Sequence, residues 1–229
     1  MKSSVVVSGA AALALVLSSA QAAEGPYVSL QGGASFLSDA DNVGAGLNLE
    51  SSFEMGFVLA GAVGYDIRNS GIRVEGEVSY RRNGLDKLTL TDDGGVGAAL
   101  GVGSLNGLTL ETDGNVSALS VMANVFYDFR LARRVKSHVG GGVGVAHLSI
   151  DDAAILGVTV IDDDDIVFAY QVGGGVGFEV TPATTIFLDY RYFATLDPTF
   201  SFFPLGGLGV AFDSEYASHN VSVGIRYNF

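Results

Sequence analysis

The sequence contains no cysteine, only four prolines, and no long apolar run after its first residues. The absence of cysteine excludes disulfide bonds and thiol catalysis. No segment beyond the N-terminal region reaches the roughly 18 apolar residues that a membrane-spanning helix needs. Nevertheless, 48% of the 229 residues are hydrophobic and the mean hydropathy is +0.37. The apolar residues must therefore be arranged in a pattern other than a helical span.

Basic residues are also scarce, with 12 Lys and Arg against 25 Asp and Glu. Nucleic-acid binding needs clusters of Lys and Arg to neutralise phosphates. We therefore expect no nucleic-acid partner. The sequence also predicts no cofactor.

The N-terminal region has the features of a secretory signal peptide. Lys2 precedes an apolar stretch from Val5 to Leu17, and the small-residue pattern Ala20-Gln21-Ala22 follows. An N-terminal anchor helix is the alternative, but this apolar core is too short to span a membrane. We predict a cleaved signal peptide at residues 1–22 and one barrel domain at residues 23–229. Loss of Lys2 changes the net charge from −13 to −14.

The remaining chain alternates apolar and polar residues with a period of two, which is typical of β-strands. In "GIRVEGEVSYRR", Ile72, Val74, Val78 and Tyr80 share one face, and the charged residues share the other. The same alternation occurs in seven other stretches: "YVSLQGGASF", "EMGFVLAGAVGY", "ALSVMANVFYDF", "HVGGGVGVAHL", "FAYQVGGGVGFEV", "IFLDYRYF" and "HNVSVGIRYNF". The pattern predicts eight strands and an all-β fold.

The connections between these strands alternate in length. Short turns, "DIRNSG", "RLARRVK" and "TPAT", follow the second, fourth and sixth strands. Long connections follow the other strands, at residues 37–52, 83–115, 151–165 and 194–217. This alternation is typical of an outer-membrane barrel with short periplasmic turns and long outward loops. We predict an eight-stranded antiparallel up-and-down transmembrane β-barrel with four long extracellular loops and three short periplasmic turns.

The two faces of the strands fit this architecture. Aromatic residues gather near the strand ends, as expected where a barrel meets the two membrane interfaces. The polar face carries ten charged residues, and an eight-stranded barrel leaves room inside for side chains only. Because isolated buried charges are costly, we predict a lumen network of ion pairs made by Glu54, Arg73, Glu75, Glu77, Arg81, Asp128, Glu179, Asp189, Arg191 and Arg226. Its role is predicted to be structural filling, with ion or proton passage as the alternative.

The strand sequences "VEGEVSYRR", "VMANVFYDF", "VGGGVGFEV" and "FLDYRYF" resemble the small outer-membrane β-barrel superfamily, which includes OmpA-like barrels and bacterial surface antigens. The resemblance implies a bacterial outer-membrane location, with membrane lipid and lipopolysaccharide as surroundings. The end of the chain is similar to the signal that the barrel assembly machinery reads, carried here by Val221, Val223, Ile225, Tyr227 and Phe229. The family includes anchors, adhesins and a few lipid enzymes, so the resemblance leaves the function open.

The long connections contain three unusual features, and the strand before one of them contains a fourth. The near-repeats "LTLTDDG" (88–94) and "LTLETDG" (108–114) predict a protruding β-ribbon, and residues 194–217 are rich in Phe and Leu. Asp151, Asp152 and the run 162–165 suggest a solvated acidic loop, with weak cation binding as the alternative. His147 and Ser149 share a strand face, a pattern similar to that of barrel lipid A deacylases.

Together these features favour a non-enzymatic surface protein, structural or antigenic, whose loops mediate adhesion or contact with a host surface or matrix. A small porin-like channel is the first alternative. A lipid A-modifying hydrolase, which depends on His147 and Ser149, is the second.

Overall fold

The structure is a computed structural model that describes residues 25–38, 40–44, 47–92, 104, 106–111, 113–155, 158–196, 199–202, 210–213 and 216–229. No helix in this part of the chain is long and apolar enough to cross a membrane.

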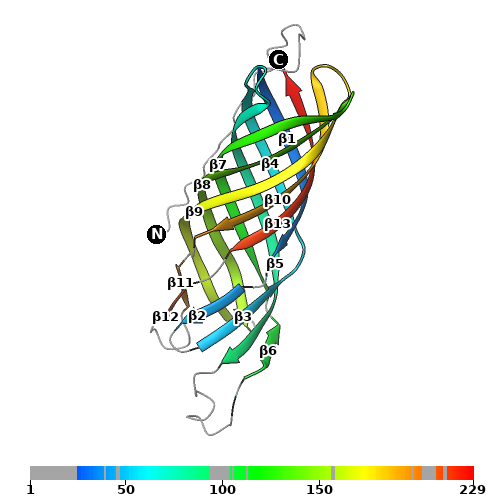
Figure 1. Ribbon diagram of the computed structural model, residues 1–229. Coiled ribbons are helices and arrows are strands. Elements are labelled where there is room, and N and C mark those ends of the chain that lie inside the picture. Colours follow the sequence, from blue (N-terminus) through cyan, green and yellow to red (C-terminus); the bar gives the residue numbers. More distant parts are fainter. Residues whose placement is uncertain are drawn as a thin grey trace.

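Eight long strands form a closed antiparallel barrel, as the alternation in the sequence predicted (Figure 1). Each strand pairs with its neighbours along the chain, and the first pairs with the last, Tyr27 opposite Asn228. The eight are β1 (Pro26–Leu37), β4 (Gly56–Asp66), β5 (Ile72–Asp92), β7 (Asp113–Ala132), β8 (Val135–Ile155), β9 (Val158–Glu179), β10 (Thr184–Thr195) and β13 (Ala217–Asn228). The closure leaves no open sheet edge in the barrel wall.

The three short turns lie at one end of the barrel, together with the C-terminus, in the upper part of Figure 1. In the first of them, between β4 and β5, Asn69 and Gly71 have positive φ angles of 58° and 71°. Asn and Gly tolerate this left-handed conformation better than other residues do. The turn end is the periplasmic end in barrels of this kind.

Short strands extend the wall at the opposite end, in the lower part of Figure 1. They are β2 (Ala40–Gly44), β3 (Leu47–Phe53), β6 (Leu108–Glu111), β11 (Thr199–Phe202) and β12 (Val210–Asp213). The two near-repeats pair with each other, since Leu88 lies opposite Leu110 and Leu90 opposite Leu108. The predicted β-ribbon is therefore present between β5 and β6.

The predicted acidic loop at residues 151–165 is wrong. Strands β8 and β9 continue through these residues, and only residues 156–157 fall between them. Asp163 lies opposite Ile150 and Asp164 opposite Ser149. The runs of aspartate suggested a solvated loop, but the β-branched residues that surround them form a paired ribbon instead.

The outward face of the barrel is a band of exposed apolar side chains. Leu30, Leu59 and Val63 are each more than half exposed, and an outer face of this kind has lipid as its surroundings in a membrane. Aromatic rings lie at both ends of the band. Phe57 and Tyr80 pack together near the loop end, and Tyr227 and Phe229 meet edge to face at the turn end.

Candidate functional site: the barrel interior

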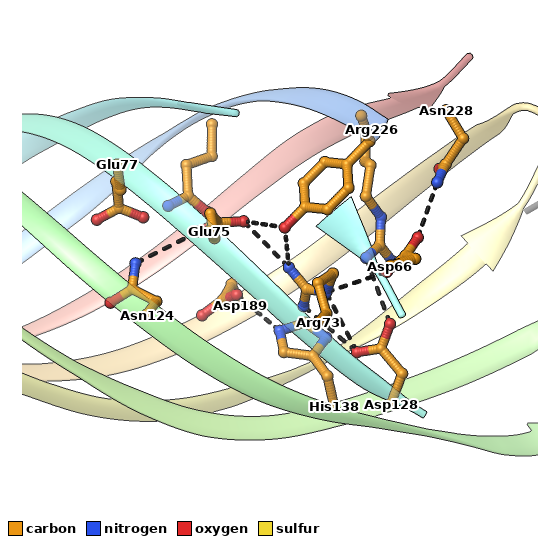
Figure 2. A network of polar contacts seen from close by, with 12 residues as sticks. Asp66, Arg73, Glu75, Glu77, Asn124, Asp128, His138, Asp189, Arg226 and Asn228 are labelled. Carbon is orange, nitrogen blue, oxygen red and sulfur yellow. Dashed lines mark hydrogen bonds and ion pairs between the residues drawn. The ribbon is translucent and has the colours of Figure 1, made fainter. Parts of the chain in front are cut away.

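Arg73 on β5 is the centre of a buried network near the turn end (Figure 2). Its Nη1 donates to Glu75 Oε2 at 3.1 Å and to the Tyr27 hydroxyl at 3.0 Å. Its Nη2 lies 3.4 Å from Asp128 Oδ1. The Tyr27 hydroxyl in turn donates to Glu75 Oε2 at 2.8 Å. The guanidinium is therefore held by partners from β1, β5 and β7.

Arg191 on β10 is the second cation of the network. It pairs with Glu77 across the lumen and with Asp189 two residues before it, at 3.1 Å. Asp189 also meets His138 of β8, with Oδ2 and Nε2 2.9 Å apart. All four side chains are nearly inaccessible to solvent. The buried charges of Arg191, Glu77 and Asp189 are tolerated because each has a partner of opposite sign.

Arg226 extends the network to the turn end, where its Nη1 lies 3.4 Å from Asp128 Oδ2. Beside it, the Asn228 side chain donates to Asp66 Oδ2 at 2.8 Å (Figure 2). These residues line a vestibule of about 180 Å³ at the periplasmic mouth. Further in, the pocket that Arg73 and Asp189 line has only about 10 Å³. Such a space holds at most about one water molecule.

The middle of the lumen contains amides and hydroxyls. Gln171 Nε2 donates to Asn124 Oδ1 at 2.8 Å and to Glu77 Oε1 at 3.3 Å. The hydroxyls of Ser79 and Ser120 lie 2.7 Å apart. Polar side chains therefore connect the charged residues around Arg73 and Arg191 to the level of Ser79 and Ser120.

Arg81 separates the polar part of the lumen from an apolar plug. Its Nη1 donates to Ser79 at 2.8 Å, and its guanidinium carbon lies 3.9 Å from the centre of the Phe193 ring. Toward the loop end, the lumen is filled by a cluster of Val116, Ala118, Met122, Ala146, Leu148, Ala169, Phe193 and Tyr216. Burial raises the pKa of Tyr216, just before β13, to about 12. The plug and the ion pairs together fill the barrel between its two mouths.

Glycines on β8 and β9 make room for the long side chains of the neighbouring strands. A Cβ atom on Gly175 would lie 2.3 Å from the Leu188 carbonyl oxygen and 2.8 Å from His138 Cε1. One on Gly173 would lie 2.3 Å from the Tyr190 carbonyl oxygen and 2.9 Å from Arg191 Cγ. These distances are shorter than ordinary van der Waals contacts. The lumen glycines are therefore part of the packing of the network.

The structure brings nine of the ten predicted lumen charges into the barrel interior or its periplasmic mouth. Glu179 lies at the mouth, 2.8 Å from Lys136 Nζ. Glu54 is the exception and corrects the prediction. It is exposed ahead of β4, and its backbone N–H donates to the Gly84 carbonyl at 2.9 Å. Glu54 lies outside the regular alternation because β4 begins only at Gly56.

The sequence analysis missed several members of the network: Tyr27, Asp66, Asn124 and His138. It also missed apolar side chains inside the lumen, such as Met122, Phe126 and Phe187. The signal was available, because all of these residues fall on the inward positions of the alternating pattern. Residue type hid the apolar members only, since the inward face of a membrane barrel is expected to be polar.

The remaining predicted residues lie on the outer face. Val221, Val223 and Ile225 of the proposed assembly signal are exposed on β13, and the Phe229 backbone N–H donates to the Pro26 carbonyl at 3.0 Å. The pairing of β13 with β1 therefore fixes the position of this segment in the barrel wall. Its recognition by the assembly machinery remains a prediction.

His147 and Ser149 lie on β8, half-buried, on the outward-facing positions. The paired residues on β9 are Ile166 and Asp164. Among the described residues, no group of three or more His, Asp or Glu side chains is arranged to hold a metal ion. The apolar connection at Phe203, Leu205 and Leu208 lies outside the described residues.

An apolar outer band, two aromatic levels and a lumen filled with ion pairs define a membrane-spanning β-barrel. The chain belongs to the outer membrane protein β-barrel domain family, whose model matches residues 8–229. Its location is the bacterial outer membrane.

Solved structures of outer-membrane barrels are similar in fold. OprG from Pseudomonas aeruginosa is 14% identical, with a TM-score of 0.55 over 90% of this chain and 97% of that one. The outer membrane protease OmpT from Escherichia coli is 10% identical, with a TM-score of 0.58 over 90% and 97%. Neisserial surface protein A is 20% identical, with a TM-score of 0.48 over 89% and 97%. No curated protein sequence matched the chain. At these identities the likeness concerns the fold alone.

Proposed function

We propose that this chain is a non-enzymatic surface barrel whose ribbon extensions make adhesive or antigenic contacts outside the cell. The observation that carries the proposal is the length of four adjacent strands. β5, β7, β8 and β9 have 20 to 22 residues each. A tilted transmembrane strand needs only about 9 to 11. The excess forms a paired wall beyond the membrane band, on the side away from the turns.

The charge of the long connections, counted from the sequence, indicates the kind of partner that they suit. The sequence segments 39–54, 86–113, 151–165 and 197–215 contain 18 acidic residues and one basic residue, Lys87. A surface of this sign repels polyanions and attracts cationic groups. A basic protein surface, or one bridged by divalent cations, therefore fits better than an anionic polysaccharide.

Trimming one ribbon tests the proposal. Residues 151–162 are replaced by Asn-Gly, a two-residue turn that joins the paired residues Ile150 and Asp163. Cells that display the trimmed barrel should attach less to host-cell layers or matrix-coated surfaces than cells that display the intact one. A charge control changes Asp162–Asp165 to Asn and keeps the ribbon length. Equal attachment by all three forms, at equal surface levels, would reject adhesion through this ribbon.

A lipid hydrolase is the second candidate, because the backbone register pairs Asp164 with Ser149, two residues from His147. An acid, a histidine and a serine are the groups of a hydrolytic triad. Ser149→Ala is the test, with lipid A acylation read by mass spectrometry. A change in acylation against the unaltered barrel supports hydrolysis, and identical acylation rejects it.

A further inference from the structure

The charged residues between the strands at the turn end are all basic. Residues 67–71, 133–134 and 180–183 contain Arg68, Arg133 and Arg134 and no acidic residue, in a chain in which acids outnumber bases by 25 to 12. Two further bases, Arg130 and Lys136, flank the β7–β8 turn, and the acidic residues Asp66 and Glu179 flank the other two turns. A tight turn needs no such charge to form. The concentration of basic side chains at this turn therefore indicates an anionic binding partner.

Three of these basic side chains line a hollow of about 310 Å³ between the β7–β8 and β9–β10 turns. Arg130, Arg133 and Arg134 line one side, and residues 179–182 line the other. The two turns are fixed to each other, because the Glu179 backbone N–H donates to the Arg134 carbonyl at 2.8 Å. The hollow is therefore held in place by the sheet.

Among the described residues that line the hollow, Glu179 is the one carboxylate. Glu179 pairs with Lys136 at 2.8 Å and with Arg130 at 3.6 Å. The side chains of Arg133 and Arg134 remain exposed at the tip of the turn. Arginine guanidinium groups bind phosphate oxygens through two parallel hydrogen bonds. The hollow therefore has the charge and the donors for one phosphate group.

The position of the hollow indicates where that phosphate comes from. Leu131, Phe178 and Val180 are exposed on the outer face beside it. Tyr127 and Phe129 stack in the same region, with ring centroids 6.4 Å apart. Aromatic residues of this kind mark the level of the lipid headgroups. A bound lipid could place its phosphate in the hollow and its acyl chains along these apolar residues.

We propose that the β7–β8 turn binds the phosphate of an anionic phospholipid in the periplasmic leaflet, with Arg133 and Arg134 as the principal donors. Each arginine near an anionic headgroup contributes measurably to binding. Removal of both is expected to lower the affinity by about tenfold or more.

Native mass spectrometry of the refolded barrel in detergent tests the proposal, with phosphatidylglycerol and phosphatidylcholine as probes. The unaltered barrel should retain phosphatidylglycerol in preference to phosphatidylcholine. Arg133→Gln/Arg134→Gln should lose that preference. Arg68→Gln removes a base at the same end of the barrel but away from the hollow, and should keep it. Gel migration of unboiled samples checks that each form is folded, and Arg134→Gln alone replaces the double variant if that one does not fold.

Three results would overturn the proposal. The first is equal retention of the two lipids by the unaltered barrel. The second is an unchanged preference in the double variant. The third is displacement of phosphatidylglycerol by millimolar inorganic phosphate, which would assign the hollow to the free anion.

Discussion

Gly142 of β8 lies opposite Asn124 of β7, and a Cβ atom at Gly142 would stand 1.9 Å from Asn124 Oδ1. The glycine thus makes room for an amide that belongs to the lumen network. Asn124 reaches Gln171 at 2.8 Å and Glu75 Oε1 at 3.4 Å. The hydrogen bonds that Asn124 makes in the interior therefore depend on the absence of a side chain at Gly142.

Gly142→Ala should lower the free energy of unfolding by about 1–3 kcal/mol, because the added methyl group overpacks the lumen. Gly76→Ala is the matched control, since a Cβ atom there meets nothing within 4 Å. Urea titration in detergent micelles, followed by gel migration of unboiled samples, measures both. Equal urea midpoints for the two variants would show that Asn124 moves away from the added methyl group without loss of stability.

Arg191→Gln should be more damaging, because it leaves the buried carboxylates of Glu77 and Asp189 without their shared cation. Breaking a buried ion pair from one side costs about 3–5 kcal/mol. Lys87→Gln removes an exposed pair with Asp86 and should cost less than about 1 kcal/mol. The same urea titration compares them. A small effect of Arg191→Gln would mean that water enters the lumen and solvates the acids.

The unaltered barrel should give no stepwise conductance in planar bilayers. The apolar plug on the loop side of Arg81 and the small volume beside Arg73 leave no room for a continuous file of water. Discrete, reproducible current steps would instead favour the channel alternative. OprG, reconstituted under the same conditions, provides a comparison barrel of similar fold.

Phe229→Ser should reduce the amount of folded barrel in the outer membrane of living cells several-fold, if the assembly machinery reads this residue. Phe129→Ser is the matched control, an exposed aromatic residue at the same end of the barrel but outside β13. Both variants should refold alike from urea into detergent. Similar losses of the two in cells would assign the effect to membrane anchoring rather than to recognition.

Much of the fold was predictable because a membrane barrel imposes a strict period of two on every strand. The pattern placed Leu59, Val63 and Tyr65 on the outer face, and all three are exposed. It failed at the ends of strands, where no bilayer enforces the alternation. Glu54 and the aspartates of residues 162–165 are the clearest cases.

The charged part of the interior was also predictable, but its partners were not. Alternation assigns Arg73 and Asp189 to the inward face, yet it cannot tell which strands face each other across the lumen. The contact between His138 and Asp189 joins residues 51 positions apart on strands that are not neighbours. Such pairings depend on the curvature of the closed sheet, which a single sequence does not encode locally.

The seam between β1 and β13 has a consequence for biogenesis. Because Tyr27 pairs with Asn228 and Phe36 with His219, the first strand finds its second partner only after about two hundred further residues have been made. Until then the unfinished sheet has two open edges, and contacts so distant in sequence form slowly. The chain must therefore be kept from aggregating between its export and the pairing of its last strand. The time at which the barrel closes then depends on the proteins that accompany the chain as well as on its own sequence.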